Sequence, residues 1–158
     1  ILVTHGHWDH IRAIKELDHL TGAVTSAGAA DAVAIKEQED YTVEEELTGG
    51  ESFDFYRSDT VIRSLHVPGH TPGSIVYTLE ATWEDGTPAT LLFTGDTLFP
   101  GGVGKTDSPQ QFGELFSNVL EKLFGGFEDD AIVLPGHGRS TTLGDERPHL
   151  EEWGTRGW

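Results

Sequence analysis

The sequence predicts an α/β fold in which short strands alternate with helices around one layered core. Apolar runs of strand length recur along the chain, segments with helically spaced apolar residues lie between them, and Gly or Pro turns separate the two. Mixed elements in this order are typical of a layered α/β architecture. The length of 158 residues fits a single domain, which we assign to residues 1–158.

The chain opens on an apolar run, residues 1–3, which predicts a buried strand. Asp9 then stands at the position of a helix N-cap, because apolar residues recur at helical spacing over 11–20 and Gly22 can end the helix. Natural proteins rarely begin inside a core strand, and the chain has no methionine. We therefore expect upstream strands to be missing; the alternative is a short domain whose first strand is terminal.

The remaining elements follow the same alternation. Asp85-Gly86 is a hairpin signal, so residues 90–94 should return antiparallel to 74–79. Residues 109–123 carry their apolar side chains on one face and predict an amphipathic helix. The other expected elements are strands at 23–25, 61–67 and 131–134, a helix at 29–37, a mostly loop segment with one short element at 38–60, a Gly-rich loop at 100–108, and a short helix with an aromatic end after Asp145.

Composition excludes several classes of function. Acidic residues outnumber basic ones by 27 to 10, and the net charge of −17 argues against nucleic-acid and membrane partners. The absence of cysteine excludes disulfides, thiolate zinc sites and a cysteine nucleophile. We see no membrane span and no signal peptide, and expect a cytoplasmic protein. The acidity fits either a high-salt cytoplasm or an ordinary acidic mesophile, and no oligomeric state follows from it.

Four predicted strands end in turns that carry imidazole or carboxylate side chains. Loops at the ends of neighbouring strands can converge on one sheet edge, so we expect these side chains to meet. His5 and His7 point the same way in an extended segment, while Asp9 and His10 follow at the turn into a helix and can reach a second point. The candidate metal ligands are His5, His7, Asp9, His10, His70, Asp96 and His137.

This ligand chemistry predicts two divalent ions. Imidazole with carboxylate suits zinc, manganese or iron, and seven ligands fit two ions that share a carboxylate better than one tetrahedral ion. Taken singly, Asp9 could be only an N-cap and Asp96 only a turn residue, but their joint spacing favours a metal site. His19, His66 and His149 lie in a helix, a strand and the tail, and we do not expect them to be ligands.

The motifs resemble those of the metallo-β-lactamase fold superfamily. Residues 4–10, Thr-His-Gly-His-Trp-Asp-His, resemble its signature, and the turns around His70, Asp96 and His137 resemble its later metal motifs in the same order. The resemblance runs from residue 1 to about residue 140 and implies a four-layer αββα sandwich, here without its first strands. In that family pattern, one ion would be held by His5, His7 and His70, a second by Asp9, His10 and His137, and Asp96 would bridge them.

Within the superfamily, the segment after Asp96 looks most like small glyoxalase II-like hydrolases. That implies a metal-dependent hydrolase in which two divalent ions, zinc first and manganese or iron as alternatives, provide a hydroxide that attacks a small-molecule thioester or ester. Asp9 would orient this hydroxide or relay its proton. Lys105 matches a substrate-binding basic residue of that group, and Arg139 is a weaker candidate.

Two other functions stay open. Persulfide dioxygenases resemble the same pattern and use one iron, which here would be held by His5, His70 and Asp96. The chain could also be an inactive metal-binding fragment, if the absent strands are needed to assemble the site. Metal identity and oxygen uptake discriminate between hydrolase and dioxygenase.

Overall fold

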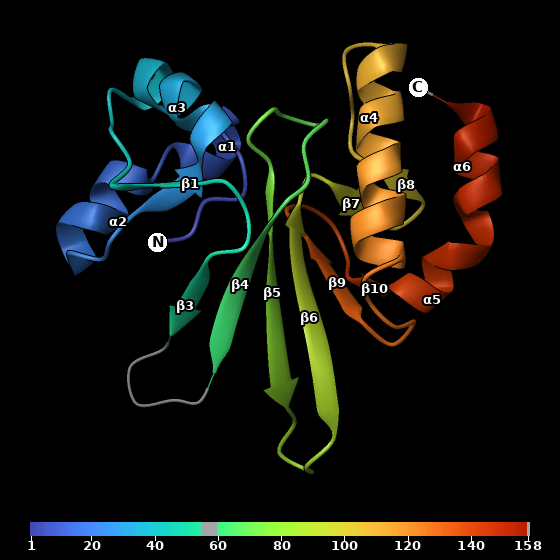
Figure 1. Cartoon of the computed structure of the whole chain (residues 1–158). Coiled ribbons are helices and arrows are strands. Elements are labelled where there is room, and N and C mark those ends of the chain that lie inside the picture. The colour runs from blue at the N-terminus through green and yellow to red at the C-terminus, as the bar shows by residue number, and fades with distance from the viewer. Residues whose placement is uncertain (55–59, 158) are drawn as a thin grey trace.

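A six-stranded mixed sheet forms the centre of the molecule (Figure 1). The computed structural model describes residues 1–54 and 60–157. Neighbouring strands run antiparallel except β6 and β9, which run parallel, so that their ends at Gly95 and Pro135 lie at the same sheet edge. In spatial order the strands are β10 (Thr141–Thr142), β9 (Ile132–Pro135), β6 (Pro88–Gly95), β5 (Ile75–Thr82), β4 (Val61–His66) and β3 (Ser52–Asp54).

The predicted hairpin between β5 and β6 is confirmed. Its strands pair antiparallel from Tyr77–Phe93 to Thr82–Pro88. Gly86 turns the chain with a φ of 87°, in the left-handed region that glycine enters without strain. The Asp85 carboxylate accepts a hydrogen bond of 2.9 Å from the Thr87 backbone, which explains why the Asp-Gly pair was a reliable signal.

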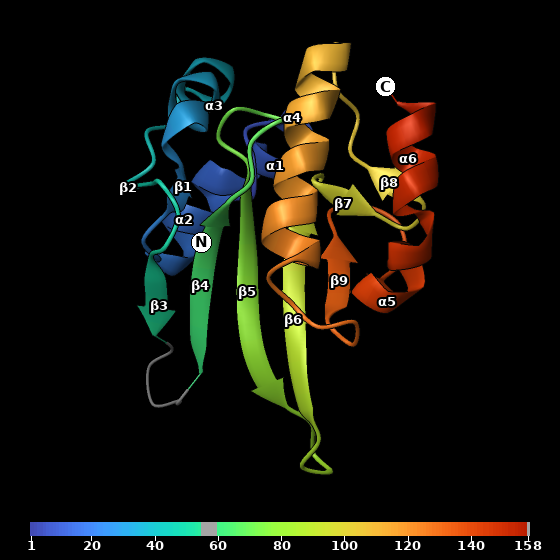
Figure 2. The same ribbon diagram turned by 45° about the vertical axis from the view of Figure 1, so that its right-hand side comes forward.

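Helices cover one face of the central sheet (Figure 2). They are α4 (Pro109–Val119), α5 (Leu143–Glu146) and α6 (Leu150–Arg156). Ser108 caps α4 by accepting a hydrogen bond of 3.2 Å from the Gln111 N–H, and Pro109 takes the first helical position. The largest core cluster joins this layer to the sheet and includes Val76, Leu92, Leu115, Val119, Leu123, Val133 and Trp153.

A small second sheet and further helices lie on the opposite face (Figure 1). Strands β1 (Ser26–Gly28) and β2 (Glu45–Leu47) pair in parallel. Leu47 of β2 packs with Ile62, Ile75 and Tyr77 of the central sheet, and a third cluster joins β1 to α1 (Trp8–Ile11), α2 (Ile14–Thr21) and α3 (Ala32–Glu39). The layers therefore follow the order helices, sheet, sheet, helices. No helix in residues 1–54 and 60–157 has the length and apolar character needed to cross a membrane.

The predicted boundaries are wrong at several places in the N-terminal half. Residues 1–3 do not form a strand: Leu2 makes one isolated parallel bridge to Ser26. The strand expected at 23–25 lies instead at β1, where Ala27 is fully buried while Val24 is half exposed. Asp9 lies inside α1, and His7 occupies the N-cap. The ends of a strand depend on the strand that it pairs with, and the start of a helix depends on tertiary packing. Neither can be read from the residues next to the boundary.

Other segments are more divided than expected. The first helix breaks at residues 12–13 into α1 and α2, and the segment 38–60 contains two strands, although its residues 55–59 lie outside the described part. The loop at 100–108 includes β8 (Gly102–Val103), which pairs with β7 (Leu98–Phe99). The helix expected at 109–123 becomes π-helical at Leu120–Phe124. Trp158, the last residue of the expected aromatic end, is not described either.

Candidate metal centre

Four segments carry the seven candidate ligands to one edge of the central sheet. The N-terminal segment brings four of them, and the other three follow β4, β6 and β9. Because β6 and β9 are parallel neighbours, Asp96 and His137 leave the sheet side by side. The structure assembles these side chains into three overlapping groups whose ligand atoms lie within 4.8 Å of one another. The first group is His5, His7 and His70, the second group is Asp9, His10 and His137, and a third, His5, His10 and Asp96, shares one histidine with each of them.

In the first group, His7 Nδ1 lies 3.0 Å from His70 Nε2. The other ring nitrogen of His70 donates a hydrogen bond of 2.7 Å to the Lys105 carbonyl. A carbonyl can only accept, so this contact assigns the proton to Nδ1 and leaves the Nε2 lone pair directed toward His7. Such backbone contacts orient imidazoles that bind metal ions.

In the second group, His10 Nε2 and His137 Nε2 lie 3.0 Å apart. Asp9 Oδ2 lies 3.1 Å from His137 Nε2 and 3.6 Å from His10 Nε2. Asp96 links the two groups, because its Oδ1 lies 3.4 Å from His10 Nε2 while its Oδ2 lies 3.9 Å from His70 Nε2. One carboxylate thus presents an oxygen to each group.

This geometry fits bound metal ions. A tetrahedral ion with ligands at about 2.0–2.1 Å separates those ligands by about 3.3 Å. The observed distances within the second group, from 3.0 to 3.6 Å, lie around that value. Among the described residues, the buried atoms His5 Nε2 and Asp96 Oδ1 have no hydrogen-bond partner. A cation would satisfy both atoms, which otherwise lose the hydrogen bonds that water would give them.

The electrostatics favour the protonation states that bind metal. Burial is the main cause that lowers the pKa of His5 to about 3, and the neighbouring histidines act in the same direction. Burial also lowers the pKa of His70. Desolvation acts to raise the pKa of Asp9, but its own backbone N–H and the adjacent His10 and His137 lower it overall. Neutral imidazoles and an ionised carboxylate are the forms that coordinate a cation.

Glycines allow the ligand-bearing loops to approach closely. A Cβ atom on Gly136 would lie 2.5 Å from Asp96 Oδ1 and 2.6 Å from His10 Cε1, distances so short that one of these side chains or the turn would have to shift. On Gly104 it would lie 1.8 Å from the Asp96 carbonyl oxygen. The backbone therefore forms part of the wall around the candidate ligands. The glycines that precede His7, His70, Asp96 and His137 were visible in the sequence, but the steric role of Gly136 was not.

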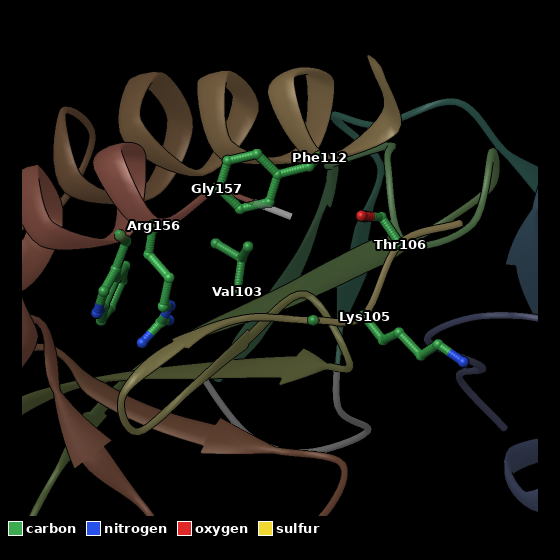
Figure 3. Close-up of a pocket in the computed structure, with 8 residues that line it drawn as sticks. Val103, Lys105, Thr106, Phe112, Arg156 and Gly157 are labelled. Atoms are coloured by element: carbon green, nitrogen blue, oxygen red, sulfur yellow. The ribbon is translucent and has the colours of Figure 1, made fainter. Parts of the chain in front are cut away.

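Lys105 lies beside this site with an exposed side chain. Lys105 is also one of the residues around a pocket of about 270 Å³ that involves Val103, Phe112 and Arg156. Figure 3 shows the Lys105 side chain extending away from these three residues. The Arg156 guanidinium donates a hydrogen bond of 3.1 Å to the Gly101 carbonyl. Sequence reasoning missed this pocket because α4, β8 and the C-terminal segment meet only in the fold.

The remaining histidines lie outside the three ligand groups. His66 contacts the Pro72 carbonyl at 2.8 Å and so supports the loop that follows β4. His149 lies 3.8 Å from Glu152, one turn along the C-terminal helical segment. His66 and His149 thus each lie against a polar group away from the candidate ligands.

The chain is similar to known proteins over nearly its whole length. The family model described as Metallo-beta-lactamase superfamily matches residues 1–137. An uncharacterized protein of Mycobacterium tuberculosis is 34% identical over 96% of this chain and 75% of its own length. Hydroxyacylglutathione hydrolase GloC of Haemophilus influenzae is 31% identical over 93% of this chain and 72% of its own length.

Solved structures show the same similarity in three dimensions. BLEG-1 B3 metallo-beta-lactamase is 26% identical with a TM-score of 0.69, covering 95% of this chain and 74% of that one. TTHA1623 in a di-iron-bound form is 28% identical with a TM-score of 0.68, covering 93% and 73%. ETHE1 from Myxococcus xanthus is 28% identical with a TM-score of 0.68, covering 94% and 60%.

Proposed function

Because the chain belongs to the metallo-beta-lactamase superfamily, we propose that it is a metal-dependent hydrolase that acts on a small thioester or ester. Membership confirms the predicted family and the mixed α/β fold class. The observation that carries the proposal is the convergence of seven imidazole and carboxylate side chains into groups linked by Asp96. The similarity to a hydroxyacylglutathione hydrolase supports a thioester as the substrate class.

We propose that His5, His7 and His70 hold one divalent ion, that Asp9, His10 and His137 hold a second, and that Asp96 bridges them. Two bound ions would lower the pKa of a water molecule and polarise the substrate carbonyl. Zinc is our first choice because imidazole and carboxylate oxygen suit it. Manganese and iron share these preferences, and TTHA1623 was solved in a di-iron-bound form.

The protein's own groups supply orientation and proton handling. Asp9 is exposed and its pKa is lowered, so its carboxylate can orient the attacking water or relay its proton. The Lys105 carbonyl keeps His70 in one tautomer. The exposed Lys105 ammonium, in a chain of net charge −17, offers a cation to an anionic end of the substrate. The net charge of −17 makes nucleic acid or an anionic membrane an unfavourable partner. We propose a cytoplasmic location.

The first test is the metal content of the purified chain by elemental mass spectrometry, followed by a thioester hydrolysis assay. We expect two zinc or manganese ions per chain and activity that a chelator removes and zinc restores. The variant His7→Ala should lose metal and activity together. A chain that binds metal but hydrolyses no thioester or ester would overturn the hydrolase proposal, and a chain without metal would identify an inactive fragment.

The second candidate is a persulfide dioxygenase with one iron held by His5, His70 and Asp96. It is favoured by the 3.9 Å approach of Asp96 Oδ2 to His70 Nε2 and by the buried, unpartnered His5 Nε2 among the described residues. The assembled group of Asp9, His10 and His137 argues for the hydrolase, because a single iron would leave those ligands unused. One iron per chain with oxygen uptake on a persulfide would select the dioxygenase.

A further inference from the structure

Asp31 is a buried carboxylate next to the candidate metal site that belongs to none of the ligand groups. It ends the short helical turn Ala29–Asp31, and only 3% of its surface is exposed. Its Oδ2 accepts hydrogen bonds from the Gly6 N–H at 2.8 Å and the Thr71 hydroxyl at 2.7 Å. Its Oδ1 accepts a hydrogen bond of 2.7 Å from the Gly73 N–H.

These three donors come from two ligand-bearing loops. Gly6 lies between His5 and His7, and Thr71 immediately follows His70. All three histidines belong to the first ligand group. Asp31 therefore joins, through one carboxylate, the two segments whose relative position sets the 3.0 Å distance between His7 Nδ1 and His70 Nε2.

The packing around Asp31 leaves little freedom for these loops. A Cβ atom on Gly73 would lie 2.5 Å from the Asp31 backbone nitrogen, and one on Gly28 would lie 1.9 Å from the Gly73 carbonyl oxygen. The Gln38 side chain donates a hydrogen bond of 2.9 Å to the Gly6 carbonyl. Both polar groups of Gly6 are thus held by side chains of the same helical segment.

The second ligand group is held by different contacts. The loops that carry Asp96 and His137 are joined by a backbone hydrogen bond of 2.8 Å from the Gly136 N–H to the Gly95 carbonyl. His10 comes from α1. The three donors to Asp31 stand beside histidines of the first group, and the donor nearest in sequence to the second group, the Gly6 N–H, lies three residues before Asp9.

We propose that Asp31 is a positioning residue that preorganises the first metal-binding group, His5, His7 and His70, and leaves the second group unaffected. The inference rests on metal binding in the proposed function. A buried carboxylate is costly unless several donors satisfy it, and here the donors are the backbone and side chains that flank the histidines. The ligand separation is therefore set before an ion arrives.

The test measures zinc affinity by chelator competition in two variant proteins, each of which retains only one complete ligand group. His137→Ala leaves the first group intact, and His7→Ala leaves the second. Asp31→Asn is nearly isosteric but offers one oxygen where the carboxylate offers two, so at least one donor loses its acceptor. We expect it to weaken zinc binding at least about tenfold in the His137→Ala background, as losses of outer-shell partners do. In the His7→Ala background the change should stay within about twofold.

Glu146→Gln is the matched control. Glu146 is also a buried carboxylate, 6% exposed, and accepts hydrogen bonds from the Gly101 N–H at 2.9 Å and the Thr141 hydroxyl at 2.7 Å. It belongs to none of the ligand groups. We expect Glu146→Gln to lower Tm while leaving zinc affinity unchanged in both backgrounds. Equal weakening of both groups by Asp31→Asn would mean a purely structural role and would overturn the proposal.

Thr71→Val provides a second variant if Asp31→Asn does not fold. It removes one of the three donors to Asp31 and should weaken the first group by a smaller factor. Wild-type chain that binds no zinc would contradict the proposed function itself. Wild-type binding that both substitutions leave intact would contradict only the role of Asp31.

Discussion

At the residue scale, Asp9 combines two possible roles that a substitution can separate. It lies at the exposed side of the candidate site, 3.1 Å from His137, and its pKa is lowered. We expect Asp9→Ala to reduce kcat by about 10²–10⁴-fold through the loss of proton handling. Some metal should remain, since His10, His137 and Asp96 stay in place. Metal content and activity are measured in the same samples. If activity falls only in proportion to the metal lost, Asp9 acts as a metal ligand and has no separate role in proton handling.

Lys105 is the residue proposed to bind the anionic part of the substrate. Its side chain is exposed, and an exposed ion pair contributes up to about 1 kcal/mol, so Lys105→Ala should raise KM about fivefold for an anionic thioester. The kcat should change little, because the proposed role of the lysine is to bind the anionic end of the substrate and not the reacting carbonyl. Steady-state kinetics of Lys105→Ala with a neutral thioester should show no change. Lys15→Ala, which removes an exposed lysine of α2, is the control and should leave KM for the anionic thioester unchanged. An unchanged KM for the anionic substrate removes the assigned role.

At the scale of elements, the turn after β9 depends on the absence of a side chain at Gly136. An added methyl group would collide with Asp96 Oδ1 and His10 Cε1. We expect Gly136→Ala to weaken zinc binding at least about tenfold, by displacing ligands that must stay within a few tenths of an ångström. Zinc titration by chelator competition measures the effect.

Gly113→Ala is the control, because a Cβ atom at this position in α4 meets nothing within 4 Å. It should leave zinc affinity unchanged and stabilise the protein by about 0.5–1 kcal/mol. Equal zinc affinities for the two variants would show that the turn can move to accept a side chain.

Glu51 ties the start of β3 to β4 and makes this edge sensitive to acid. Burial would raise the pKa of Glu51, but hydrogen bonds from the Ser64 hydroxyl and the Thr48 backbone outweigh it and lower the pKa to about 2. The ordinary value is 4.5, so the unfolded chain binds this proton first, and the stability that Glu51 contributes is lost as pH falls from about 4.5 to about 2. Glu51→Gln should therefore be less stable than wild type at pH 7, with the two Tm curves converging below pH 4. Curves that stay parallel over this range would contradict the assignment.

For the whole molecule, the net charge of −17 sets the response to salt. Acidic residues cluster at Glu44–Glu46 and Glu128–Asp130, and their mutual repulsion opposes the compact state. If the surface is adapted to high salt, Tm should rise steeply as KCl approaches molar concentrations, beyond the range in which simple screening is complete. A flat Tm in molar KCl would identify an ordinary acidic protein.

Local patterns determined much of what was predictable. The amphipathic face of residues 109–123 produced α4, and Asp85-Gly86 produced the β5–β6 hairpin, because both signals act over a few residues. The seven candidate ligands were recognisable because imidazole and carboxylate groups follow short apolar runs of the sequence. Ligand chemistry and turn geometry depend on a few consecutive residues, so they can be predicted from the sequence alone.

Only the tertiary structure decided which of these segments meet. The parallel pairing of β6 with β9 brings Asp96 beside His137, and the packing of the 69–74 loop on the helical turn at Asp31 brings His70 beside His7. Strand pairing likewise moved β1 away from its predicted position. The sequence by itself determined the side chains available for chemistry at the sheet edge. Long-range contacts decided the grouping of these side chains, the hydrogen bonds of the buried Asp31 carboxylate and the pocket beside α4. Each of these features joins residues that lie far apart in the sequence.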